Sequence, residues 1–96
     1  MFLRFTYIYF PSEKRAEAKD IYMTEILPVI RMQKGNKQVL LPEPADGNDE
    51  FISYSLWEDE SDIKKFEAST DYVAVIDRVK EIVSKPPLQK YYLVNS

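Results

Sequence analysis

The sequence predicts an α+β domain of the ferredoxin-like class, a sandwich in which a four-stranded antiparallel sheet carries its helices on one face. Three observations lead to this class. Strand and helix patterns follow one another in the order β-α-β-β-α-β. Right-handed crossovers in such an order place both helices on the same side of the sheet. Because 96 residues with 45% hydrophobic content suit one core, we expect a single domain over residues 1–96.

The first half of the chain supplies a strand, a long helix and a short strand. Residues 2–10 are rich in β-branched and aromatic side chains at both parities, which is typical of a strand covered on both faces. Pro11 ends this strand. A helical pattern then runs over residues 12–34, and Pro28 is expected to kink it. The second strand is predicted at residues 37–41.

The second half repeats the theme with a strand, a helix and a strand. A loop rich in Pro, Gly, Asp and Asn precedes the third strand, which is predicted at residues 50–57. The second helix begins at Asp59 or Ser61, and we expect a break at residues 69–71, where three side chains compete for backbone hydrogen bonds. A Pro-Pro pair ends the helix, and residues 88–94 form the last strand.

An open sheet face does not fit strands that are apolar on both sides. In the first strand, one set of alternate positions is mostly apolar and so is the other. A second copy of the chain would cover the uncovered set, because two sheets can pack face to face. The sequence therefore predicts a homodimer that resembles a barrel, a dimeric α/β barrel.

Composition excludes several classes of protein. The net charge is −3 and no basic surplus is present, so no nucleic-acid partner is expected. With no Cys and no His, the chain can have no disulfide, thiolate nucleophile or imidazole metal ligand. A general base would have to be Asp, Glu, Lys or Tyr. The acidic run at residues 58–62 is read as a solvated turn that caps a helix, and no metal site is expected.

The N-terminal apolar segment is also read as structural. Residues 1–10 contain Arg4, lack a basic leader and a cleavage signal, and are too few to span a bilayer. We therefore expect a cytoplasmic protein with no membrane partner.

A pocket is predicted on one side of the third strand. Its alternate positions place Ser53 and Ser55 between two aromatic rings, which leaves room for a small apolar or aromatic ligand and supplies hydrogen-bonding groups. The other interpretation is that Trp57 is an ordinary core residue and that the two serines relieve crowding. Residues of the first strand and the second helix are expected to line the same space. The candidate substrate-binding residues are Tyr7, Tyr9, Ser53, Ser55, Trp57, Phe66, Tyr72 and Ile76.

These residues also carry a resemblance to a known family. The run Ser-Leu-Trp-Glu at 55–58, followed by Asp62, Phe66, Ser69 and Tyr72, resembles the antibiotic biosynthesis monooxygenase family, as do Glu-Ile-Leu-Pro at 25–28 and Gly35. The resemblance implies a dimeric α/β barrel with a pocket between sheet and helices. It further implies that some members oxidise phenolic or quinol-type substrates with dioxygen, without metal, flavin or haem, while other members degrade haem.

The chain departs from the family at two informative positions. Haem-degrading members have a His ligand near the position of Ile76, and this chain has no His. Cofactor-independent members carry an Asn where Ser53 stands, whereas their Trp is kept as Trp57. The resemblance thus implies a cofactor-independent monooxygenase, with Trp57, Ser53 and Tyr72 as candidate catalytic residues. The alternative is a non-catalytic, dimeric small-molecule-binding protein of the same fold.

Overall fold

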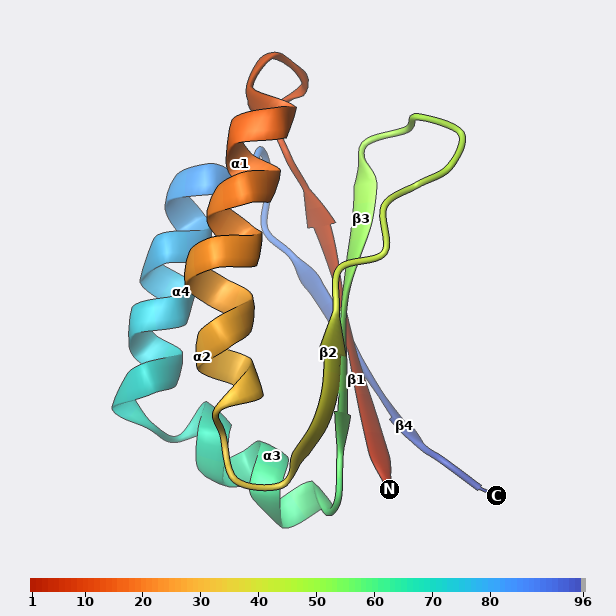
Figure 1. The fold of residues 1–96 in the computed structure, drawn as a ribbon, viewed down its shortest axis with the longest axis vertical. Helices are drawn as coiled ribbons and strands as arrows, with labels where there is room; N and C mark the ends of the chain where they lie inside the picture. The colour runs from red at the N-terminus through yellow and green to blue at the C-terminus, as the bar shows by residue number, and fades with distance from the viewer. Residues whose placement is uncertain (96) are drawn as a thin grey trace.

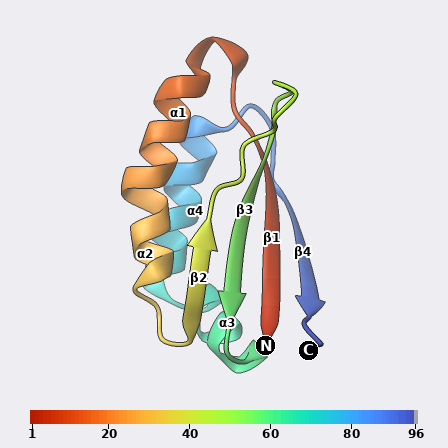
Figure 2. The ribbon, with the colours of Figure 1, turned by 45° about the vertical axis from the view of Figure 1, so that its right-hand side comes forward.

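The computed structural model describes residues 1–95 and confirms the predicted ferredoxin-like fold (Figure 1). Four antiparallel strands form one sheet in the order β2-β3-β1-β4, so the two ends of the chain contribute neighbouring strands. Figure 2 shows the helices as a layer on one side of this sheet. The strands are β1 (Phe2–Tyr9), β2 (Asn36–Leu40), β3 (Glu50–Trp57) and β4 (Leu88–Leu93).

The first helical region contains the predicted irregularity. Because Pro28 has no N–H, it cannot continue the α-helical hydrogen-bond ladder. The structure places a π-helical segment directly before it, and Gly35, at φ 85°, then makes the left-handed turn into β2. The region consists of η1 (Ser12–Lys14), α1 (Arg15–Ile21), the π-helix η2 (Tyr22–Ile26) and α2 (Leu27–Arg31).

The second helical region is broken where the sequence predicts it. It divides into α3 (Glu60–Glu67) and α4 (Thr70–Ile82). Ser69 caps α4: its Oγ accepts from the Tyr72 backbone N–H at 3.2 Å and donates to the Phe66 carbonyl at 2.5 Å. The break turns the chain between α3 and α4. In Figure 1, α3 lies at the end of the sheet where the N-terminus is found.

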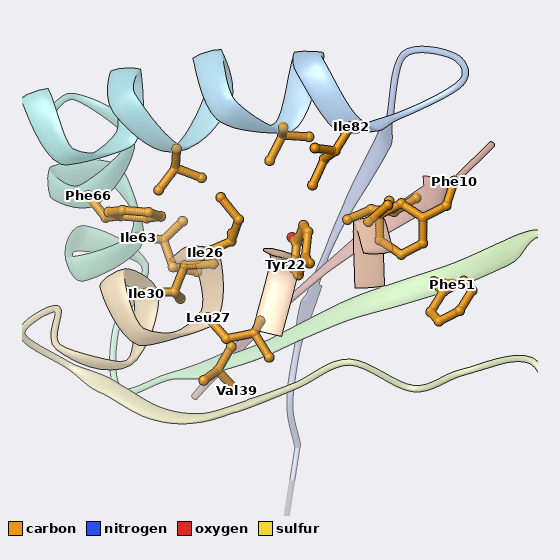
Figure 3. Packing of buried hydrophobic residues seen from close by; sticks show 14 of the residues in the cluster. Phe10, Tyr22, Ile26, Leu27, Ile30, Val39, Phe51, Ile63, Phe66 and Ile82 are labelled. Atoms are coloured by element: carbon orange, nitrogen blue, oxygen red, sulfur yellow. The ribbon is translucent and has the colours of Figure 1, made fainter. Parts of the chain in front are cut away.

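The core fills the space between the sheet and the helices. Figure 3 shows its side chains, from Phe66 at one end to Phe10 and Phe51 at the other. The largest side chains with almost no exposed surface are Trp57, Phe10, Phe51, Phe66, Ile8, Ile26, Ile30 and Ile63. No helix within residues 1–95 is long and apolar enough to cross a membrane.

Strand register decides which side chains join this core. In β3 the buried positions are 51, 53, 55 and 57, and in β1 they are 4, 6 and 8. The other face has no helix over it in the described chain (Figure 2). It is nevertheless aromatic, because the Phe5 ring lies 5.7 Å from Tyr54 and 5.4 Å from Tyr92.

Candidate functional site

The centre of the predicted pocket is a packed aromatic cluster, formed by Trp57, Phe66 and Tyr72. Trp57 ends β3 and is 0% exposed. Its ring stacks on Phe66 at 5.6 Å and 24°, and its Nε1 donates to Ser55 Oγ at 2.9 Å. Tyr72 completes the cluster with an edge contact to Phe66 at 5.2 Å. The Ser55 hydroxyl therefore satisfies a buried indole N–H, as an ordinary core would require.

A polar cluster begins where the aromatic cluster ends. It comprises Arg4, Glu67, Tyr72, Gln89 and Tyr91, which belong to β1, α3, α4 and β4. The Tyr72 hydroxyl oxygen accepts two hydrogen bonds of 3.1 Å, one from Arg4 Nη2 and one from Gln89 Nε2. The Arg4 guanidinium also lies 5.4 Å from the centre of the Tyr72 ring. Tyr72 is thus the residue shared by the two clusters.

Arg4 is the buried charge of the site, with only 5% of its surface exposed. Its Nε lies 3.1 Å from Glu67 Oε2, close enough for an ion pair. The N–H does not point well enough at that oxygen to make a hydrogen bond, so among residues 1–95 the buried Nε has no hydrogen-bond partner. A buried guanidinium depends on its counter-charge, because an unpaired charge in the interior is strongly destabilising. Arg4 therefore holds Glu67 at this point of the fold.

Glu67 is bound from a second side by Tyr91. The Tyr91 hydroxyl donates to Glu67 Oε2 at 2.5 Å and lies 3.0 Å from Gln89 Oε1. A phenol has one proton, and the carboxylate is the stronger acceptor at the shorter distance. Burial and the hydrogen bond to Glu67 raise the pKa of Tyr91, and Arg4 partly offsets this. The Tyr91 phenol is therefore held in its neutral, proton-donating form.

An inner cavity of about 20 Å³ lies beside the polar cluster, between the sheet and the helices. Its volume suits a single water-sized molecule. Tyr22, from the first turn of the π-helix, is fully buried here, and burial raises the pKa of its hydroxyl to about 12 against the lowering effects of Ser53 and Arg4. The lining residues are Arg4, Thr6, Ile8, Tyr22, Ile30, Tyr72, Val75, Ile76, Val79, Pro87 and Gln89.

An outer cavity of about 390 Å³ opens between α3 and the helix-facing side of β1 and β4. It is lined by Phe2, Glu60, Ile63, Lys64, Glu67 and Tyr91. The volume lies within the range of small-molecule sites, and the lining combines apolar rings with a few polar groups, as such sites do. Glu67 and Tyr91 belong both to this cavity and to the polar cluster, so they form the wall between the outside and the interior.

The structure brings most of the predicted site residues together. Tyr72 and Ile76 line the inner cavity. Ser53 lowers the pKa of the Tyr22 hydroxyl beside it. Trp57, Phe66 and Ser55 pack next to them and contact one another.

Tyr7 and Tyr9 are not part of this arrangement, contrary to the expectation from the sequence. In the register of β1 with β3, Tyr7 lies opposite Ile52 and Tyr9 opposite Glu50, on the face without helices. The Tyr9 hydroxyl donates to Glu50 there at 2.7 Å. The physical reason is the pleat: positions 7 and 9 have the opposite parity to the buried positions of β1.

Several residues of the site carry weak signals in the sequence. Arg4 is the exception, because it is the one charge in a strand that is otherwise apolar or uncharged, which marks it as unusual. Glu67, Gln89 and Tyr91 look like ordinary surface residues, and only the pairing of β1 with β4 brings them to Arg4. Within residues 1–95, no group of three or more His, Cys, Asp or Glu side chains is arranged to hold a metal ion.

The fold and site together define a class: a ferredoxin-like α+β domain with a cavity of about 390 Å³ between α3 and its sheet. A comparison with protein families makes this specific. Residues 1–78 match the family model described as antibiotic biosynthesis monooxygenase, and the chain belongs to this family. The resemblance inferred from residues 25–28, Gly35 and residues 55–72 is thereby confirmed.

Solved structures share the fold across the whole chain. A Deinococcus radiodurans protein that carries the family's name has 16% identity and a TM-score of 0.85, with 100% of this chain and 94% of that chain covered. Rv0793 from Mycobacterium tuberculosis has 17% identity and a TM-score of 0.80 over 99% and 95%. A mutant of SnoaB, a cofactor-independent oxygenase from Streptomyces nogalater, has 10% identity and a TM-score of 0.81 over 99% and 94%. A search of curated proteins gave no significant match.

Proposed function

We propose that this chain is a cofactor-independent monooxygenase that oxidises a small aromatic or quinol-type substrate with dioxygen. Family membership supports the reaction class, and SnoaB is a structural neighbour described as a cofactor-independent oxygenase. The observation that carries the proposal is the outer cavity of about 390 Å³, whose inner wall leads into the polar cluster. It offers room for one or two aromatic rings beside titratable groups.

The proposed reaction balances without an added reductant, as a simple phenol illustrates. The phenol O–H bond breaks and its proton passes to a protein base. The phenolate gives one electron to dioxygen, and the two radicals join through a new C–O bond at the ring carbon opposite the hydroxyl. This peroxide takes up a proton, and its O–O bond then breaks together with the C–H bond at the same ring carbon, so that hydroxide and that proton leave as water. One phenol and one dioxygen thus give one quinone and one water.

Tyr72 is the residue that we place directly behind the outer cavity, where it positions Arg4 beside Glu67. Its hydroxyl oxygen already accepts from Arg4 and Gln89, so its own proton is left for another acceptor. Trp57, with Phe66 stacked on it, forms the rigid wall that keeps Tyr72 in place. Ser53 lies deeper in the interior, where it lowers the pKa of the buried Tyr22 hydroxyl.

Oxygen consumption tests the proposal. Chelator-treated protein is mixed with a panel of quinols and polyphenols in an oxygen electrode. We expect uptake by the wild type and about a tenfold loss in Tyr72→Phe, which removes the hydroxyl that accepts from Arg4 behind Glu67. Tyr7→Phe is the matched control, because it removes the same group from the other face of the sheet and should keep wild-type uptake. No uptake by the wild type across the panel would reject the proposal.

We also propose that the uncovered face of the sheet forms a homodimer. Large apolar side chains remain accessible there, including Leu88 at 55%, Leu40 at 47% and Tyr92 at 43% exposed. Contiguous apolar surface on a small domain marks an interaction site. Light scattering should give twice the chain mass for the wild type and a single chain mass for Phe5→Asp, which places a charge in the middle of that face. A monomeric wild type would contradict this proposal.

A second function is favoured by one observation: the inner cavity beside the polar cluster has a volume of about 20 Å³, which is too small for an aromatic substrate. A dimeric protein that binds a small aromatic ligand in the outer cavity without oxidising it would need nothing more. It predicts a rise in melting temperature with ligand and no oxygen uptake. Uptake that requires the folded protein would exclude it.

A further inference from the structure

We infer that Glu67 is the carboxylate that receives the hydroxyl group of a phenolic ligand in the outer cavity, and that Tyr91 occupies this position until the ligand displaces it. The inference rests on the proposed function only for the class of substrate. It adds a contact residue, Glu67, and a self-blocking contact, which neither the fold nor the family comparison assigns.

The free protein already contains the contact that a phenolic ligand would make. The Tyr91 phenol donates to Glu67 Oε2 at 2.5 Å, and both residues line the outer cavity. A short, charge-assisted O–H···O⁻ bond is among the stronger hydrogen bonds of proteins. A ligand phenol in the cavity presents the same donor to the same acceptor, so Tyr91 and the ligand compete for Glu67.

The Tyr91 side chain can leave this contact, whereas the Glu67 side chain is held in place. Tyr91 is 49% exposed and belongs to β4, an edge strand of the sheet. Its side chain can rotate outward without opening the core, and the hydrogen bonds that it gives up can be replaced by water. Glu67, in contrast, is tied to the buried Arg4, whose Nε lies 3.1 Å from Oε2. Both Arg4 and Tyr91 contact Oε2, so Oε2 is the oxygen at which a ligand phenol would replace Tyr91.

The charges of the site stay paired when such a ligand binds. The ligand phenol donates to Glu67 and keeps its proton, as Tyr91 does in the free protein, so Glu67 remains the counter-charge of the buried Arg4. The other charged groups of the cavity, Glu60 and Lys64, lie on α3 with Glu67.

Binding of 2-naphthol in the absence of oxygen tests the inference. The probe is a fluorescent phenol, and without dioxygen no turnover interferes. Tyr91→Phe keeps the ring but removes the competing hydroxyl, so it should bind 2-naphthol about 2- to 10-fold more tightly than the wild type. Glu67→Gln should bind it about tenfold more weakly, because the charge-assisted bond is lost. 2-Methoxynaphthalene, which has no donor, should bind the wild type and Tyr91→Phe equally.

The outcomes separate this inference from the proposed function. If Tyr91→Phe binds 2-naphthol no more tightly than the wild type, the competition does not exist and the inference is overturned. The same holds if the gain is equal for 2-methoxynaphthalene, since the hydroxyl is then irrelevant. A hydroxyl-dependent gain supports the inference even where no oxygen is consumed, which would reject only the monooxygenase. Thermal melting of Glu67→Gln checks that the loss of its charge has not unfolded the protein around Arg4.

Discussion

Trp57 and Tyr91 lie at opposite ends of the same chain of contacts, and they are held in opposite ways. Trp57 is 0% exposed and fixed by stacking on Phe66, whereas Tyr91 is 49% exposed and bound by hydrogen bonds to Glu67 and Gln89. A ring fixed by packing cannot move without opening a cavity, but a ring held by hydrogen bonds can exchange them for water or ligand. The contrast teaches that the sequence motif around Trp57 marks the scaffold, and that the contacts able to exchange lie at the rim, around Tyr91.

The largest expected effect is on stability, at the buried end of this chain of contacts, where Trp57 lies. Trp57→Ala should lower the free energy of unfolding by about 3–5 kcal/mol, because it leaves a cavity between Ser55 and Phe66 that the core cannot fill. Urea denaturation followed by circular dichroism measures it. Trp57→Phe keeps most of the ring and serves as the control, with a smaller loss. If Trp57→Ala were as stable as the wild type, Trp57 would not be the packed centre of the core.

The loss of stability at high pH tests the burial of Tyr22, which belongs to the same core as Trp57. Its pKa is raised to about 12 from 10.0 by burial, so above pH 10 the unfolded chain releases this proton while the folded protein keeps it. Stability is therefore lost as pH rises through this range, by about 1 kcal/mol between about pH 10 and about pH 11. Tyr22→Phe should lack this component. Parallel unfolding curves at about pH 9 and pH 11 measure the difference, and an equal loss in both proteins would show that Tyr22 ionises freely.

The smallest expected effect is on stability at the rim, where Tyr91 is compared with Tyr72. Tyr91→Phe should change the free energy of unfolding by less than about 1 kcal/mol, because water can replace a half-exposed hydrogen bond. Tyr72→Phe should lose more, since its buried hydroxyl oxygen accepts from both Arg4 and Gln89. Thermal melting of the two variants compares them. A loss at Tyr91 larger than that at Tyr72 would mean that the rim is part of the rigid core.

Much of the fold could be predicted because its signals are local. Runs of β-branched and aromatic residues mark β1 and β3, Pro28 marks the disturbed helix, and residues 69–71 mark the break between α3 and α4. These features depend on neighbouring residues, so one sequence contains them. It was harder to predict which alternate positions of β1 face the core, because apolar side chains occupy both faces. It was Arg4, Thr6 and Ile8 that turned inward, and not Tyr7 and Tyr9.

The candidate site was only half predictable, for a topological reason. Trp57, Phe66 and Tyr72 follow one another within a short stretch, and their spacing can be read from the sequence. Arg4, Glu67 and Tyr91 are spread over the whole chain and meet only because β1 and β4 are neighbours beside α3. No local pattern reports that contact. A charged residue inside an apolar strand was the one available signal.

Isotope labelling gives the most direct test of the central claim, that this protein inserts oxygen without a cofactor. Chelator-treated wild-type protein is incubated under ¹⁸O₂ with the phenolic compound that it consumes most rapidly, and the product is analysed by mass spectrometry. We expect one ¹⁸O atom in each quinone and one dioxygen consumed per product. Product without label, or product formed equally fast by heat-unfolded protein, would contradict the account and leave a binding protein in its place.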